Sequence, residues 1–141
     1  MSPLNKNTTM NRFIKFITIL SITVLLPLSS HAEELPGNIT TGFKNGDASL
    51  ISGFFKNTVE LSINGKEDIY SSTQAEIILK DFFNLHTPNG FEVIHQGGQG
   101  ASKYAIGSLK TDSGTYRVTL LIKATDSKSY IHQLRIEKDG V

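Results

Sequence analysis

The sequence predicts an α+β fold in which helices pack on one face of a curved, mostly antiparallel sheet. Two segments, near residues 36–55 and 72–86, carry apolar residues at helical spacing. From Phe91 onward the chain alternates between strand-length runs and short turn sequences. Together with a hairpin near residues 58–71, these observations predict the order α-α-β-β-α-β-β-β-β. Helices first and a run of strands last are typical of an α+β domain.

The first two helices follow from their end signals. Pro36 stands near the start of the first helix, with Asn38 as its expected cap. The sequence Asn45-Gly46-Asp47 ends that helix and caps a second, short one. The apolar stripe of the second helix is expected to consist of Leu50, Ile51, Phe54 and Phe55.

A hairpin and the longest helix come next. Residues 58–63 alternate between polar and apolar side chains, as in a half-buried strand, and Asn64-Gly65 is a hairpin turn that returns into residues 67–71. The helix opens at Ser72 or Thr73; with Thr73 as cap, Glu76 completes a capping box. Its expected apolar face is Ile77, Ile78, Leu79, Phe82, Phe83 and Leu85.

Four strands complete the chain, at residues 91–96, 102–111, 115–124 and 129–137. The glycine-rich sequence 97–100 lies between the first two. A phosphate-binding loop would need a helix after it, but a strand follows, so these glycines are expected to let the chain turn or bulge.

Residues 1–32 have the layout of a secretory signal peptide, and residues 33–141 are expected to form a single domain. Lys6, Arg12 and Lys15 precede a 13-residue apolar run, and Ser30-His31-Ala32 offers a cleavage site. Without the signal, 11 of the 14 basic residues remain against 13 acidic ones, which argues against a nucleic-acid partner. There is no cysteine, which excludes disulfides and thiolate chemistry. We expect an exported protein, periplasmic or secreted, without a stable membrane anchor after cleavage.

The element order resembles the cystatin-like cone fold of the superfamily of nuclear transport factor 2, ketosteroid isomerase and SnoaL. Residues 43–47, the following Leu50, Phe54 and Phe55, the strand 59–65, and residues 74–76 with Phe82 and Phe83 carry the resemblance. It is closest to the small exported members without a characterised function. The resemblance implies a cavity between sheet and helices, and often a dimer formed through the outer sheet face.

Strand alternation selects four candidate ligand-binding residues: His95, Tyr104, Tyr116 and His132. His95 is in phase with Phe91 and Val93, and the other three are in phase with apolar residues of their own strands. All four side chains are therefore expected to point toward the helices. A partly buried histidine can serve as a general base, but no Asp or Glu shares this phase to orient it. A third metal ligand is also missing, so we expect neither a metal nor a cofactor.

Three functions remain open from the sequence. The first is a non-catalytic binding module that takes an apolar or amphipathic ligand in the cone, or a protein partner on the sheet. The second is an enzyme of isomerase or dehydratase type that uses a pocket histidine with a tyrosine. The third is a structural homodimer whose cavity is filled by its own side chains.

Overall fold

The computed structural model describes residues 34–125 and 127–140, and the predicted signal peptide lies outside them. The elements follow the predicted order. The helices are α2 (Gly37–Asn45), α3 (Ala48–Ser52) and α4 (Ser72–Leu85). The strands are β1 (Phe55–Ile63), β2 (Lys66–Ser71), β3 (Pro88–Gln99), β4 (Ser102–Thr111), β5 (Gly114–Ala124) and β6 (Ser129–Lys138). The α+β fold class is confirmed.

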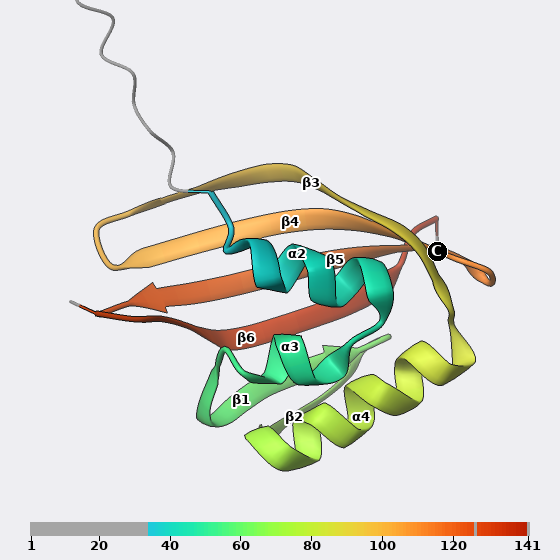
Figure 1. Ribbon diagram of the computed structural model, residues 1–141, viewed down its shortest axis with the longest axis horizontal. Helices are drawn as coiled ribbons and strands as arrows, with labels where there is room; N and C mark the ends of the chain where they lie inside the picture. Colours follow the sequence, from blue (N-terminus) through green and yellow to red (C-terminus); the bar gives the residue numbers. More distant parts are fainter. Residues whose placement is uncertain (1–33, 126, 141) are drawn as a thin grey trace, which may run out of the picture. The chain divides into compact units, whose positions relative to one another are not determined.

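The six strands form one sheet in the order β2-β1-β6-β5-β4-β3, and the helices cover one face of it (Figure 1). All neighbouring strands are antiparallel except β1 and β6, which run parallel. The last strand thus lies between the first strand and β5. We call the face that carries the helices the inner face and the opposite one the outer face.

The ends of the helices show which of the predicted capping residues set the helix bounds. Asp47 caps α3, because its Oδ1 accepts hydrogen bonds from the backbone N–H groups of Ser49 and Leu50. The expected Asn38 cap was wrong: α2 begins at Gly37, after Pro36, without a side-chain cap.

The expected stripe of the second helix was too long. Helix α3 ends at Ser52, and Phe55 already belongs to β1. The carbonyl of Phe54 accepts a 2.7 Å hydrogen bond from the N–H of Ile131 in β6. Pairing with a strand distant in the sequence therefore overrides the helical spacing of Phe54 and Phe55.

The cap of α4 is Ser71, one residue before the first expected cap, Ser72, and two before the second, Thr73. Ser71 Oγ accepts from the backbone N–H of Gln74, and the Gln74 side chain returns to the N–H of Ser71, which completes a capping box. Glu76 instead accepts a 2.6 Å hydrogen bond from Ser52 Oγ. The predicted apolar face was too wide, since Ile77 and Leu85 are 57% and 74% exposed.

Phenylalanine rings fill the space between the helices and the sheet. Phe43 stacks on Phe91 with ring centroids 4.8 Å apart, and Phe83 meets Phe43 edge-on at 6.2 Å. On β4, Gly107 leaves room for the Phe91 ring. Leu79, Leu109, Val118, Leu134 and Ile136 are fully buried around these rings.

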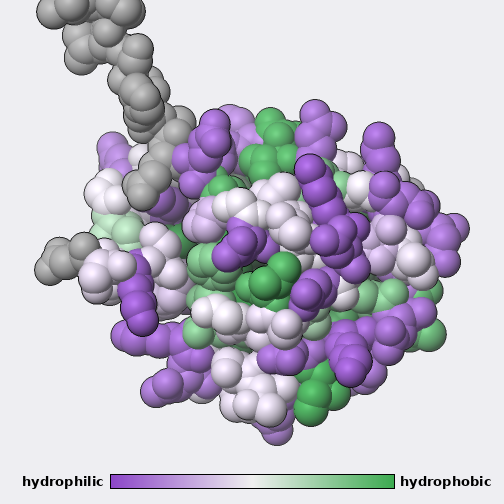
Figure 2. Space-filling model, in the orientation of Figure 1, coloured by the Kyte–Doolittle hydropathy of each residue, from purple (hydrophilic) through white to green (hydrophobic). Residues whose placement is uncertain are grey.

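The helix side of the molecule is mainly polar on its surface. Figure 2 shows apolar residues there in separate patches among charged and neutral ones. No helix in the described part of the chain is long and apolar enough to cross a membrane.

Strand β3 is longer than predicted because the glycines pair with β4. Gly97, Gly98 and Gln99 lie opposite Tyr104, Lys103 and Ser102. The turn itself is Gly100-Ala101, with Gly100 at a φ of +56°. The interpretation of this sequence as a turn between two strands is confirmed.

Candidate functional site

The four candidate residues do not share one face of the sheet. His95 and Tyr104 lie on the outer face, and Tyr116 lies on the inner face. His132 lies at an irregularity of β6. The expectation that all four point toward the helices was therefore wrong. Two β-bulges displace His95 and His132, whereas Tyr104 points outward because Ala105, Gly107 and Leu109, in the opposite phase of β4, are the buried residues.

The first bulge turns His95 outward. Val93 lies opposite Gly107, which is buried on the inner face, but the register shifts before His95, which lies opposite Ile106. Ile94 is the extra residue, and its side chain is 57% exposed. An added residue reverses the alternation, so His95 leaves the phase of Phe91 and Val93.

His95 and Tyr104 form a pair on the outer face. Tyr104 Oη lies 2.9 Å from His95 Nε2, and their ring centroids are 5.6 Å apart. The tyrosine ring lies across Gly97, where a Cβ atom would stand 3.0 Å from Tyr104 Oη. The glycine therefore provides the space that lets Tyr104 reach the histidine.

Tyr116 belongs to a second cluster that the sequence reasoning missed. Its side chain is buried, and its Oη lies 3.2 Å from Nδ1 of His86, the residue that follows α4. His86 also hydrogen-bonds through Nδ1 to Ser113 Oγ in the β4–β5 turn, and its ring lies 4.8 Å from that of Phe82. These contacts fasten the end of α4 to the sheet. The only sequence signal for His86 was its spacing of four residues from Phe82.

The second bulge displaces His132. Leu121 lies opposite Gln133 and Ile122 opposite Ile131, so His132 has no partner on β5. Its side chain is half-buried. Burial lowers the pKa of His132 from the ordinary 6.5; the positive charge of Lys123 lowers it further, and the carboxylate of Glu60 acts in the opposite direction.

The outer face has an apolar half and a charged half. Tyr104, Ile106, Thr119 and Leu121, half-buried residues of β4 and β5, form what we call the central patch. One row of paired residues runs from Gly97 through Tyr104, Leu121 and Gln133 to Glu60. The row changes from aromatic and apolar to polar as it crosses the sheet.

Ion pairs mark the charged half. The Arg135 guanidinium lies 2.9 Å from the Glu67 carboxylate and 3.7 Å from that of Glu137. Beside it, the Gln133 amide donates to Glu60. These side chains are partly exposed, so each pair adds little to stability but defines a polar surface.

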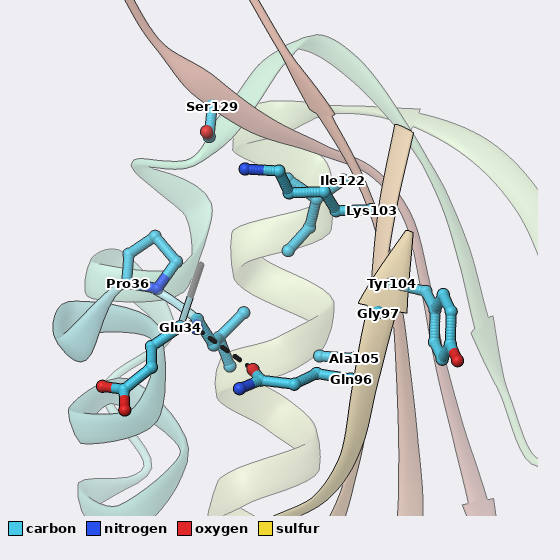
Figure 3. Close-up of a pocket in the computed structure, with 10 residues that line it drawn as sticks. Glu34, Pro36, Gln96, Gly97, Lys103, Tyr104, Ala105, Ile122 and Ser129 are labelled. Carbon is cyan, nitrogen blue, oxygen red and sulfur yellow. Dashed lines mark hydrogen bonds between the residues drawn. The ribbon is translucent and has the colours of Figure 1, made fainter. Parts of the chain in front are cut away.

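A small cavity of about 40 Å³ lies at the edge of the inner face, where residues 34–36 cross the β3–β4 hairpin (Figure 3). Gln96, Ala105, Ile122 and Ser129 are among its lining residues. Figure 3 shows Gln96 and Tyr104 on opposite sides of the strands. The described residues contain no group of three or more His, Cys, Asp or Glu side chains that could hold a metal ion.

A family model described as "Domain of unknown function (DUF4783)" matches residues 36–137, which contain the helices and nearly all of the sheet. The chain belongs to the DUF4783 family. A DUF4783 protein of Bacteroides ovatus ATCC 8483 is 31% identical with a TM-score of 0.72, and the match covers 77% of this chain and 98% of that chain. A second, from Bacteroides uniformis ATCC 8492, is 30% identical with a TM-score of 0.71, covering 77% of this chain and 100% of that chain.

More distant structures share the fold alone. A protein of Nostoc punctiforme PCC 73102, described as a domain of unknown function with a cystatin-like fold, has a TM-score of 0.60 at 9% identity. That match covers 74% of this chain and 73% of that chain. The comparison with curated proteins finds no match. The predicted cystatin-like fold is confirmed. The two DUF4783 relatives are described by family, without an activity.

Proposed function

We propose that this DUF4783 protein is a non-catalytic interaction module that binds a protein partner through the outer face of its sheet. The observation that carries the proposal is the contrast between the two faces. The inner face is covered by helices and filled by side chains, whereas the central patch on the outer face stays half-exposed.

The packed interior weighs against a small ligand inside the cone. Phe43, Phe83 and Phe91 occupy the space that a ligand would need, and each is at most 6% exposed. The cavity at the edge of the inner face measures about 40 Å³. Pockets for drug-sized ligands measure roughly 300–1,000 Å³. A ligand inside the cone would have to displace several aromatic rings.

The outer face is large enough for a protein interface. Six strands about 4.8 Å apart span roughly 24 Å, and a strand of about ten residues, the typical length in this sheet, spans roughly 34 Å. The resulting area of roughly 800 Å² matches the surface that each partner contributes to a standard interface. A central patch of Tyr104, Ile106 and Leu121 beside a charged flank also has the composition of such an interface.

The enzyme alternative gains less support. His86 pairs with Tyr116 in a packed corner, and His95 pairs with Tyr104 on an exposed strand surface. The hollow that His95 lines is open to solvent, so it would not exclude water from a reaction. Near His132, Glu60 supplies a carboxylate that strand phase did not reveal, but its oxygen already accepts from Gln133.

The proposal is tested first with a second copy of the chain as partner. Leu121→Lys places a charge in the central patch, while Ile77→Lys places one on the exposed side of α4 as a matched control. Sedimentation velocity over a range of concentrations should show association of the wild-type and Ile77→Lys proteins, and a monomer for Leu121→Lys.

A different partner protein calls for a second measurement. A photo-crosslinking amino acid at position 106 should capture a protein in the producing cells, and the same amino acid at position 77 should not. Monomeric wild-type protein would reject the homodimer alternative. Equal or absent crosslinking at both positions, together with a monomer, would reject the outer face as an interface.

A further inference from the structure

Residues 34–36, which we call the strap, cross the mouth of the space between the helices and the sheet. The strap runs into α2 and lines the 40 Å³ cavity together with residues of β3, β4, β5 and β6 (Figure 3). Leu35 is half-buried and packs against the core, whereas Glu34 is exposed.

The strap is attached weakly compared with the elements around it. The N–H of Leu35 donates to Oε1 of the Gln96 side chain over 3.3 Å, which is long for such a bond. The carbonyl of Pro36 accepts from Ile39 within the first turn of α2. Because the strap lies directly before α2, it can leave the mouth without breaking any strand pair of the described sheet.

The side chain of Leu35 leaves part of the space at the mouth unfilled. The cavity of about 40 Å³ remains on one side of it. A second hollow, open to solvent, is lined by Leu35 together with Thr40, Val93, Ile94 and His95. Protein interiors are closely packed, and the stacked rings of Phe43 and Phe91 in the core are buried. The mouth is therefore loosely filled although the core beneath it is closely packed.

The chemistry of the mouth matches a peptide. Ala105 and Ile122 offer an apolar floor, while Gln96 and Ser129 offer hydrogen-bonding groups. In the strap, Leu35 provides both matching groups: an aliphatic side chain for the apolar floor, and a backbone N–H that donates to Gln96 Oε1. A hydrocarbon chain could fill the floor but has no donor for the Gln96 oxygen, whereas any extended peptide has both groups.

We propose that the mouth is a binding site for a short extended peptide segment with an aliphatic residue, and that the strap occupies this site as an internal plug. The aliphatic side chain of the peptide replaces that of Leu35, and its backbone N–H donates to Gln96 Oε1. This site is separate from the outer-face interface proposed above, so either proposal can fail alone.

The test is a titration of the isotope-labelled chain with acetyl-Glu-Leu-Pro-amide, the sequence of the strap itself, followed by NMR. Leu35→Ala weakens the plug, and Leu85→Ala is the matched control at an exposed leucine on α4. Because a plugged site binds in proportion to its open fraction, Leu35→Ala should raise the apparent affinity by roughly tenfold over the wild type. Leu85→Ala should not change it.

The contacts are tested in the Leu35→Ala background. Gln96→Ala should weaken peptide binding by up to roughly tenfold, the loss of one partly buried hydrogen bond, while Gln99→Ala on the same strand should not. Acetyl-Glu-Ala-Pro-amide should bind more weakly than the leucine peptide. The shifted resonances should belong to Gln96, Ala105 and Ile122.

Three results would overturn the proposal. One is the absence of shifts in folded Leu35→Ala protein up to about 10 mM peptide, beyond a millimolar dissociation constant. Another is an equal affinity of the wild-type and Leu35→Ala proteins for the peptide. The third is saturable binding of a fatty acid at these resonances without binding of the peptide. If Leu35→Ala does not fold, the wild-type titration decides, since it must show weak binding at the same resonances.

Discussion

Replacing Gly107 with alanine should destabilise the protein through a single contact. A Cβ atom at this position would stand 2.3 Å from Cζ and 2.5 Å from Cε2 of the Phe91 ring. The ring has little freedom to retreat, because it is buried and stacks on Phe43 at 4.8 Å. The added methyl group must therefore displace packed aromatic rings or the strand itself.

The magnitude follows from the cost of overpacking. Inserting a methyl group into a closely packed core costs about 1–3 kcal/mol, and this contact is short enough to expect about 2 kcal/mol. For a domain of roughly 100 residues, each kcal/mol lowers Tm by about 4–8 °C. Gly107→Ala should therefore lower Tm by roughly 8–16 °C.

The assay is urea unfolding monitored by circular dichroism, with a thermal scan beside it. Gly90→Ala is the matched control, because Gly90 also lies in a strand but a Cβ there would have nothing within 4 Å. It should change the free energy of unfolding by no more than about 0.5 kcal/mol. Phe91→Leu should restore part of the stability lost in Gly107→Ala. Equal effects of the two glycine substitutions would refute the reasoning, as would additive effects of Gly107→Ala and Phe91→Leu.

Two further predictions concern the cap of α4 and the bulge of β6. Ser71→Ala removes the side chain that caps the N-terminus of α4 and should lower the free energy of unfolding by about 1 kcal/mol, whereas Ser72→Ala, one residue into the helix, should cost less in the same urea titration. A reversed order would show that Ser71 is not the functional cap. His132 has a folded-state pKa lowered below 6.5, so the unfolded chain binds its proton more readily and stability should fall as the pH drops through 6.5. His132→Gln should reduce the fall in urea midpoint between about pH 7.5 and pH 5.5, and an unchanged fall would contradict the assignment.

Local chemistry made much of the fold predictable. Strand β4 has the predicted bounds, 102–111, because alternation and flanking turn residues define a strand without outside help. The same holds for the Asn64-Gly65 turn, where both residues have positive φ, and for the Asp47 cap. Each of these features depends on residues only a few positions apart.

The candidate site was predictable only in part. Selecting His95, Tyr104, Tyr116 and His132 required strand phase alone, and the sequence supplied it. The positions of His95 and His132 depend on the extra residues in β3 and β6, because one added residue reverses every side chain beyond it. The face of Tyr104 depends on which of the two phases of β4 meets the helices. Nothing in the sequence around Ile94 or His132 marks a bulge, since both residues suit a regular strand.

The sequence by itself determined the class of fold, the order of the elements, most of their bounds and the residues available for a site. The tertiary structure decided that β6 lies between β1 and β5, parallel to β1, and that Phe54 and Phe55 leave α3 to follow that pairing. It also placed Tyr104 and Tyr116 on opposite faces of the sheet. The physical reason is that strand pairing joins residues far apart in the chain, and the free energy of that pairing outweighs the local preference of any short segment.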